Sequence, residues 1–281
     1  MAVKLVTDST ADLPESLIRK HHLTVVPLRV HFGEESYRDG LDIWASEFYY
    51  KLETGGLQPH TSQPSPGDFL EVYKRLTADG SEVVAIVLSR ELSGTYQSAE
   101  VARQMLGRTA VTVVDSASAS LGLGLIALEA ARWAEEGAPG AKVAEAARRA
   151  SSRIVLFFLV DTLEYLQKNG RIGRASALLG SLLNIKPILT LQDGIVTPVD
   201  KIRGKSKALG RIFELLRERV GQSPARWAVV HADRPDEAVS LAERVKREFR
   251  CVEPPVIGEI GPVIGSHVGP GTIGIVALPQ E

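Results

Sequence analysis

Three polar turns follow predicted strands, and each carries hydroxyl groups that could contact a ligand. They are Asp8-Ser9, Ser93-Gly94-Thr95 and Asp115-Ser116. Because Ser93 stands between a strand and a helix, its hydroxyl and the first N–H groups of the helix could bind an anion together. The alternative is that Ser93 only caps the helix, and Asp-Ser pairs such as those at Ser9 and Ser116 usually close turns. Ser93 is therefore the strongest candidate of the three.

A second group of candidates is cationic and lies near predicted turns in the second half of the chain. Arg171 and Arg203 stand beside glycines, and His267 lies in a glycine-rich segment. Arg can hold a phosphate through two parallel N–H bonds, and His can donate a hydrogen bond to it. Four neighbouring cations are expected to form an ordinary solvated surface: Lys168, Arg174, Lys201 and Lys205.

The sequence has no motif for a metal or a nucleotide. The histidines His21, His22 and His60 lack the spacing of metal ligands, and the acidic segment at residues 34–42, which includes Glu34, Glu35, Asp39 and Asp42, is expected to form a solvated loop. A Walker-type phosphate loop and a strand-linked Gly-x-Gly-x-x-Gly pattern are both missing. We therefore expect no cofactor and no metal, and we assign any ATP chemistry to another protein.

The first half of the chain alternates strand, polar turn and helix, which predicts a parallel sheet covered by helices. Strands are expected at residues 3–7, 83–88 and 111–114, with an Ala/Leu-rich helix at 121–135. Asp12 is expected to cap an early helix that has Pro14 in its first turn. Since parallel strands share a direction, the polar turns should lie along one edge of the sheet, where such folds bind ligands.

The pattern changes near residue 152, after which a mixed sheet is expected. An apolar strand at 154–160 is followed by helical segments near 162–167 and 175–183. Asp193-Gly194 lies between two strand-like segments and predicts a hairpin. The remaining expected elements are a helix at 205–220, a strand at 227–231, a helix at 236–249, a strand at 256–260, a glycine-rich segment at 261–271 and a strand at 272–278. We predict two α/β domains, 1–152 and 153–281, because 281 residues exceed what one core usually organises.

Composition indicates an ordinary globular protein, with 44% hydrophobic and 24% charged residues and a net charge of −1. This charge gives no field that would attract nucleic acid, and no aromatic and basic pattern suggests nucleic-acid binding. No segment approaches the roughly 20 apolar residues that span a bilayer. The first residues lead directly into a predicted strand without the features of a signal peptide, so a cytoplasmic location is expected. The single cysteine, Cys251, is expected to be structural.

Six motifs in order resemble those of the DegV family of bacterial fatty-acid-binding proteins, and the likeness covers essentially the whole chain. The segments are residues 8–14 (DSTADLP), 61–69 (TSQPSPGDF), 92–99 (LSGTYQSA), 163–172 (LEYLQKNGRI), 183–188 (LNIKPI) and 260–274. The resemblance implies an N-terminal α/β/α domain, a C-terminal mixed-sheet domain, and an acyl chain held in a tunnel between or beside them. It also implies a separate ATP-dependent kinase that phosphorylates the bound fatty acid.

The resemblance assigns roles to particular residues. Thr61 and Ser93 match positions whose hydroxyls hold the fatty-acid carboxylate, while Arg171, Arg203 and His267 match residues for the kinase or the acyl phosphate. Thr61 lies in an extended segment before Pro64, where the backbone can direct its hydroxyl outward. The chain is thus expected to be a non-catalytic carrier of a long-chain fatty acid that contacts a membrane surface during lipid exchange.

Two other functions stay open at this point. The chain could be a hydrolase or phosphotransferase that uses Ser93 as nucleophile and His267 as base, although no Gly-x-Ser-x-Gly motif or third orienting group supports it. It could also be a regulatory or storage lipid-binding protein without a kinase partner. Turnover of an acyl ester by the isolated protein would favour the first, and phosphorylation assays with the cognate kinase would separate the second from the carrier.

Overall fold

The computed structural model describes residues 2–107, 110–178 and 185–280. Within these residues the strands form three sheets, and the first is a four-stranded sheet in the order β2-β1-β6-β7, in which all neighbours are parallel. Its strands are β1 (Val3–Asp8), β2 (Thr24–Val26), β6 (Glu82–Val87) and β7 (Val111–Asp115). The predicted parallel sheet of the first half is therefore confirmed.

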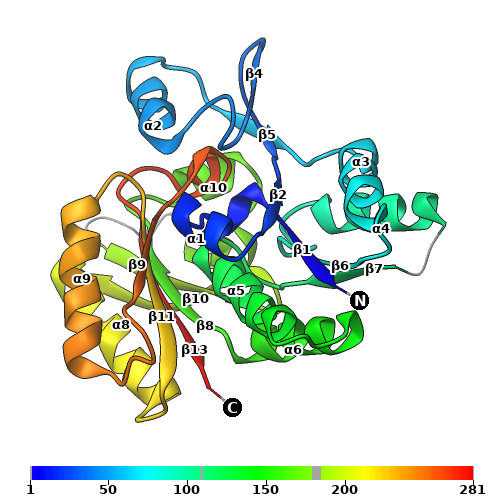
Figure 1. Cartoon of the computed structure of the whole chain (residues 1–281). Helices are drawn as coiled ribbons and strands as arrows, with labels where there is room; N and C mark the ends of the chain where they lie inside the picture. Colours follow the sequence, from blue (N-terminus) through cyan, green and yellow to red (C-terminus); the bar gives the residue numbers. More distant parts are fainter. Residues whose placement is uncertain (1, 108–109, 179–184, 281) are drawn as a thin grey trace.

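Helices cover both faces of this sheet, so the first half is a three-layer α/β/α arrangement (Figure 1). One face packs against α3 (Pro66–Thr77) and α4 (Thr95–Leu106), and the other against α5 (Leu121–Glu135) and α6 (Gly140–Arg153). Ser65 starts α3 through a capping box, because its hydroxyl accepts from the Asp68 N–H while the Asp68 carboxylate accepts from the Ser65 N–H.

The second sheet is six-stranded and mixed, in the order β10-β9-β8-β13-β11-β12. Only β11 and β12 are parallel neighbours in it. Its strands are β8 (Val155–Leu159), β9 (Ile185–Gln192), β10 (Ile195–Arg203), β11 (Ala225–His231), β12 (Val256–Glu259) and β13 (Ile273–Pro279). Asp193 and Gly194 both have positive φ between β9 and β10, as the predicted hairpin requires. The helices α8 (Lys205–Val220) and α9 (Pro235–Glu248) pack on its outer face.

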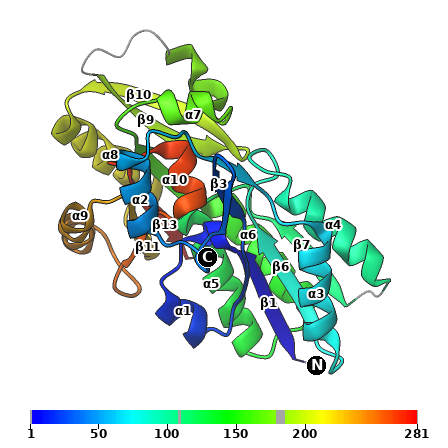
Figure 2. The same cartoon turned by 90° about the horizontal axis from the view of Figure 1, so that it is seen from above.

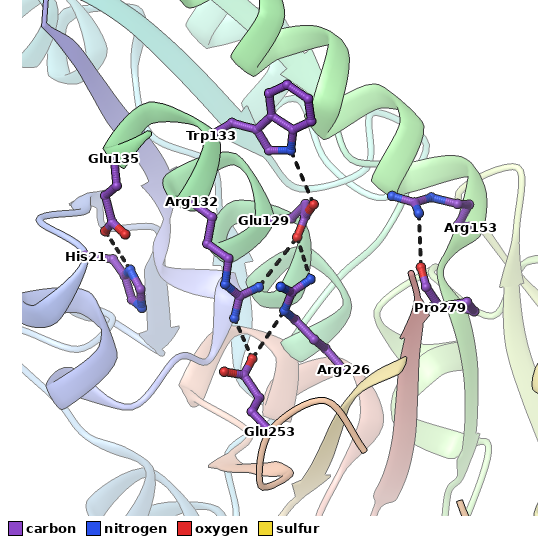
Figure 3. Close-up of polar contacts among 9 residues, drawn as sticks. All are labelled: His21, Glu129, Arg132, Trp133, Glu135, Arg153, Arg226, Glu253 and Pro279. Carbon is purple, nitrogen blue, oxygen red and sulfur yellow. Dashed lines mark hydrogen bonds and ion pairs between the residues drawn. The ribbon is translucent and has the colours of Figure 1, made fainter. Parts of the chain in front are cut away.

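The helices α5 and α6 lie between the two large sheets (Figures 1 and 2). Nearly every side of α5 is buried, because it contacts β1 and β6 of the first sheet and β11 and β13 of the second. Figure 3 shows that α5 is also tied to the second half by charge: the Glu129 carboxylate accepts from Arg226 at 2.7 Å, and Arg132 pairs with Glu253. One apolar cluster runs through both halves, so the domain boundary at residues 152–153 stays a prediction.

A small antiparallel sheet, β4-β3-β5, is a feature that the sequence did not reveal. It consists of β3 (Arg29–Phe32), β4 (Glu35–Arg38) and β5 (His60–Ser62), with α2 (Ala45–Thr54) between the last two. Asp39 follows β4 and is buried, so the expected solvated loop is wrong at this residue, although Glu34, Glu35 and Asp42 are exposed. Hydrogen bonding from the Ser9 side chain and the Val263 N–H offsets only part of the cost of burial, because the buried Oδ2 atom of Asp39 has no hydrogen-bond partner among the described residues.

The prediction that Asp12 caps the first helix is also wrong. Asp12 ends the short 3-10 turn Ser9–Ala11 in the left-handed conformation, with φ 49°, and α1 (Glu15–Lys20) begins after Pro14 without a side-chain cap. The Asp12 carboxylate instead accepts from the Ser120 hydroxyl at 2.5 Å and from the Gly261 N–H at 3.0 Å. Two distant segments therefore donate hydrogen bonds to the carboxyl group that was expected to cap α1.

The segments around the glycine-rich region contain short helices. Residues 261–271, expected as a glycine-rich segment, contain the helix α10 (Pro262–Val268), and within this range only Gly269 and Gly271 have positive φ. The helix α7 (Glu164–Lys168) falls in a predicted helical segment. Of the helix expected at 175–183, the described part is the end of a 3-10 helix, Gly173–Leu178, and the rest lies outside the described residues.

Candidate functional site

A cavity of about 860 Å³, including the solvent space at its mouth, lies between the second sheet and residues that follow strands of the first sheet. Leu28, Leu88 and Ala119 line it from the first half of the chain, and Leu156, Phe158 and Val230 line it from the second. Polar residues also line it, and among them are four of the predicted site residues: Thr61, Ser93, Arg171 and His267. Mostly apolar walls with a few polar groups are typical of sites for small amphipathic ligands.

Thr61 and His267 form the polar pair that links the two halves at this cavity. Thr61 is the middle residue of β5, His267 lies in the last turn of α10, and the residues are 206 positions apart. The Thr61 Oγ1 and His267 Nε2 atoms are 2.9 Å apart, which is a normal hydrogen-bond distance. The structure therefore brings together two residues that the sequence had assigned to separate roles.

His267 is a neutral imidazole at physiological pH. Burial, and to a smaller extent the nearby positive charge of Arg171, together lower its pKa to about 4. Among the described residues, the buried Nδ1 atom of His267 has no hydrogen-bond partner. His267 is thus available to this site as a neutral donor or acceptor rather than as a cation.

Ser93 lies at the start of α4, where the sequence placed it. Its hydroxyl is 2.9 Å from the Thr95 hydroxyl and accepts weakly from the Thr95 N–H at 3.3 Å. The N-cap residue itself is Gly94, which has no side chain to cap the helix. Ser93 therefore has a partial capping contact, and its hydroxyl also lines the cavity.

Gln63 explains how the segments that carry Thr61 and Ser93 come together. A Cβ atom placed on Gly94 would stand 2.9 Å from Nε2 of Gln63, so the two segments are in close contact and a larger residue at Gly94 would require the Gln63 side chain to move. Gln63 also lines the cavity. Gln63 belongs to the motif at residues 61–69, but its contact with Gly94 depends on how two segments pack and could not be recognised before the fold was known.

Arg171 lies at the rim of the cavity and is oriented by backbone carbonyl groups. Its Nε donates to the Leu92 carbonyl at 3.1 Å, and its Nη1 donates to the Asn169 carbonyl at 2.8 Å. The first of these bonds holds the guanidinium group beside the segment that carries Ser93. Asn169 in turn donates through its amide to the Ser266 carbonyl of α10 at 2.7 Å, a contact that the sequence did not suggest.

Arg203 stands apart from this group. It is the last residue of β10, it is exposed, and it does not line the cavity. Three of the four other cations that the sequence grouped with Arg171 and Arg203 are ion-paired: Lys168 with Glu164, Arg174 with Asp193 and Lys205 with Glu237. Lys201 is exposed as well. The structure thus brings four of the five candidate residues to one cavity and leaves Arg203 outside it.

The remaining polar candidates have structural contacts. The Ser9 hydroxyl accepts from the Leu28 N–H, and the Ser116 hydroxyl closes a turn with Ser118. His21 contacts Glu135 (Figure 3), and His60 stacks on His31. In the part of the chain that the structure describes, no group of three or more His, Cys, Asp or Glu side chains could hold a metal ion.

The geometry does not assemble a nucleophile and its base. The Ser93 hydroxyl contacts Thr95, the His267 ring contacts Thr61, and no hydrogen bond joins Ser93 to His267 among the described residues. A serine nucleophile is activated by a base within hydrogen-bond reach. The arrangement is therefore better suited to holding a polar group than to attacking a carbonyl.

Comparison with known sequences identifies one family. A family model described as "Uncharacterised protein, DegV family" matches residues 2–280. A DegV domain-containing protein of Streptomyces coelicolor is 39% identical over 276 residues, which are 98% of this chain and 97% of the relative. Protein DegV of Bacillus subtilis is 36% identical over 277 residues, 98% of each chain.

Comparison with solved structures agrees over the whole chain. A DegV family protein from Thermus thermophilus, described for its fatty acid binding, has a TM-score of 0.94 at 40% identity, with 100% of both chains covered. DegV of Bacillus subtilis, described as a fatty acid binding protein, has a TM-score of 0.90 at 34% identity and the same coverage. A stearic-acid-binding protein from Eubacterium ventriosum has a TM-score of 0.89 at 25% identity and covers 99% of this chain and 98% of its own.

Proposed function

The chain belongs to the DegV family, and we propose that it binds one long-chain fatty acid in the apolar cavity against its second sheet and presents the carboxylate to a separate kinase. The observation that carries this proposal is the apolar cavity with the hydrogen-bonded pair Thr61 and His267 in its wall. The relatives described as binding fatty acids support the ligand class. The kinase step rests on the resemblance and on the residues around Arg171.

Burial of the acyl chain supplies the binding free energy in this proposal. A chain with roughly 15 methylenes gains on the order of 12 kcal/mol at about 0.8 kcal/mol for each methylene. Association costs roughly 4 to 15 kcal/mol in lost freedom of motion. The apolar contribution is thus large enough to offset most of this cost, and the head-group contacts decide whether the acid is retained through purification.

Thr61 and Ser93 hold the carboxylate by hydrogen bonds, and His267, which the resemblance assigns to the kinase or the acyl phosphate, also orients the Thr61 hydroxyl. A neutral His267 carries one ring proton, and a proton on Nε2 would be donated to Thr61 Oγ1. This tautomer leaves the buried Nδ1 as a bare acceptor and frees the Thr61 hydroxyl to donate to the carboxylate. Ser93 provides a second hydroxyl. A buried carboxylate needs hydrogen-bond donors to replace water, and these two hydroxyls are such donors. Because they are uncharged, they do not neutralise the negative charge of the carboxylate as a buried cation would.

The kinase step uses the same carboxylate as a nucleophile. A carboxylate oxygen forms a bond to the γ-phosphorus of ATP held by the kinase, the bond from that phosphorus to the β-phosphate oxygen breaks, and ADP leaves with an acyl phosphate remaining on this chain. Arg171 at the cavity rim, and Arg203 outside it, are the cations that we assign to the incoming phosphoryl group or to the kinase surface. This chain then serves as the non-catalytic subunit and needs no metal or cofactor of its own.

Location and lipid exchange follow from the same proposal. We place the protein in the cytoplasm, where a kinase and ATP are available, with contact to a membrane surface when the acid is exchanged. Among the residues that the structure describes, no helix is long and apolar enough to cross a membrane. A regulatory protein without a kinase would share the cavity but would give no acyl phosphate.

The proposal is tested on the purified full-length chain. Denaturing extraction followed by mass spectrometry should find close to one fatty acid per chain, and the loaded protein should form acyl phosphate only when the kinase and ATP are both added. A protein that is empty and also fails to take up added fatty acid contradicts the binding function. A loaded protein that the cognate kinase leaves unphosphorylated supports the regulatory alternative, and turnover of an acyl ester by the chain alone supports a hydrolase.

A further inference from the structure

The first turn of α10 is held by two carboxylates from the other half of the chain. The Gly261 N–H donates to Asp12 Oδ1 at 3.0 Å across 249 positions of sequence. The Asp39 carboxyl lies beside the same glycine, and hydrogen bonding from the Val263 N–H favours its charged form, although its buried Oδ2 atom has no hydrogen-bond partner among the described residues. The first N–H groups of a helix have no partners within the helix, and glycine at the N-cap offers no side chain to satisfy them. Asp12 and Asp39 therefore cap α10 from outside its own segment.

The fit between these carboxylates and the helix is close. A Cβ atom on Gly261 would stand 3.1 Å from Asp12 Oδ1 and 3.2 Å from Asp39 Oδ1, so the backbone approaches both oxygens where a side chain would crowd them. The Tyr49 hydroxyl donates to the Ile260 carbonyl at 3.0 Å. The start of α10 is thus bound on several sides by residues of the first half of the chain.

The other end of α10 carries the head-group residue. His267 lies four positions after Val263, about one helical turn and roughly 6 Å along the axis. Its ring reaches Thr61 at 2.9 Å. Because a short helix moves as one body, a shift of its first turn changes the His267–Thr61 contact directly. Asp12 is itself fixed by the Ser120 hydroxyl at 2.5 Å, so the support is rigid.

Burying two acidic residues side by side costs free energy of folding, which suggests that they have a function. Asp12 and Asp39 are almost fully inaccessible, and each has its pKa raised, mainly because burial disfavours the charged form and partly because neighbouring Asp side chains repel it. Neutral residues could fill the same space. Orienting a helix that bears part of a ligand site gives these residues a role that packing alone does not.

We propose that Asp12 and Asp39 are positioning residues for the head-group site: they hold the first turn of α10 and thereby set the orientation of His267 toward Thr61. This inference rests on the proposed fatty-acid site for its functional consequence. Its structural part, that the two carboxylates control the His267 ring, stands independently of the ligand.

The test follows the His267 ring and the affinity for fatty acid in the same variants. The chain has six histidines, so nitrogen-15 spectra of histidine-labelled protein are simple, and His267→Gln identifies the His267 signals. Asp12→Ala and Asp39→Ala should shift or broaden these signals and weaken binding of oleic acid about tenfold. Asp39→Asn should restore both properties toward wild type, since its carboxamide oxygen can still accept from the Val263 N–H.

Asp42→Ala is the matched control, because Asp42 is an exposed carboxylate three positions after Asp39 that pairs with Arg38 instead of α10. It should leave the His267 signals and the affinity unchanged. Unchanged His267 signals in folded Asp12→Ala and Asp39→Ala, or an equal change in Asp42→Ala, would overturn the inference. If the alanine variants do not fold, Gly261→Ala replaces them, because its Cβ atom would crowd both carboxylates and should shift the His267 signals. Unchanged His267 signals in Gly261→Ala would also overturn the inference.

The two proposals fail in different ways. Wild-type protein that binds no fatty acid contradicts the proposed function, while the His267 signals of the variants still decide whether Asp12 and Asp39 position the ring. If fatty-acid binding is normal and the His267 signals do not change in the Asp12 and Asp39 variants, only the positioning role is contradicted.

Discussion

Replacing Thr61 by valine tests the head-group site most directly. The substitution keeps the branched shape of the side chain in β5 and removes one hydroxyl, so the small sheet should remain intact. The hydroxyl has two partners in our proposal, the fatty-acid carboxylate and the His267 ring nitrogen 2.9 Å away. Both partners lose a hydrogen bond when valine is present.

The expected loss in affinity follows from the charge of the ligand. A hydrogen bond to a charged group contributes about 1.5 to 3 kcal/mol. Thr61→Val should therefore weaken fatty-acid binding by roughly ten- to more than a hundredfold. The apolar contribution, on the order of 12 kcal/mol gross, is unaffected, so weaker binding remains measurable.

Displacement of a fluorescent fatty acid measures this change. Thr61→Ser keeps a hydroxyl and should bind close to wild type, whereas Thr61→Val should not. A double-mutant cycle with His267→Ala should give a coupling free energy of about 0.5 to 3 kcal/mol, because the two side chains share one hydrogen bond. If Thr61→Val binds as tightly as wild type, the carboxylate is held elsewhere. Additive effects would show that His267 acts independently of Thr61.

Three further predictions concern other residues. Ser93→Ala should weaken fatty-acid binding about tenfold in the same displacement assay. Its thermal midpoint of unfolding should not change. Arg203→Ala should keep its fatty acid but form acyl phosphate about 10² to 10³ times more slowly, because it removes a cation near the transferred charge; equal loss of lipid and transfer would place Arg203 in the lipid site instead. The pKa of Asp39 is raised to about 7, mainly by burial and then by Asp8, while the hydrogen bonds from Ser9 and Val263 oppose the shift. The folded state therefore holds an extra proton between about pH 4 and 7, and this group makes the free energy of unfolding fall as pH rises through that range. Urea unfolding from pH 4.5 to 8 should show a shallower fall for Asp39→Asn than for wild type.

Local patterns in the sequence predicted most of the regular elements. The apolar run in β6 predicted a parallel strand, and the Asp193-Gly194 pair predicted the hairpin. Both features depend on residues that are close in sequence. The small sheet was missed because its strands lack such a local pattern. Its strand β5 has three residues, and exposed polar side chains interrupt β4, so neither carries a periodic signal.

The site was predictable only as separate parts. Thr61 and His267 were both named from motifs, but a contact across 206 positions depends on how two sheets and α10 pack. Asp39 was misread because its acidic neighbours Glu35 and Asp42 are exposed, and nothing local distinguishes the one carboxylate that is buried. Asp12 was misread because its partner Gly261 lies almost the whole chain away.

The position of α5 has a consequence for how the chain can be divided. Gly124 lets α5 lie against the backbone of the first half, since a Cβ atom there would stand 2.9 Å from the Ala11 carbonyl oxygen. Its opposite side is covered by β11 and β13 of the second half. A fragment that ends after α6 would expose that side to water, and a fragment that begins at β8 would lack the helix that covers its sheet. The chain should therefore unfold in one cooperative step, and neither fragment expressed alone should be a soluble monomer, although the two could assemble when produced together.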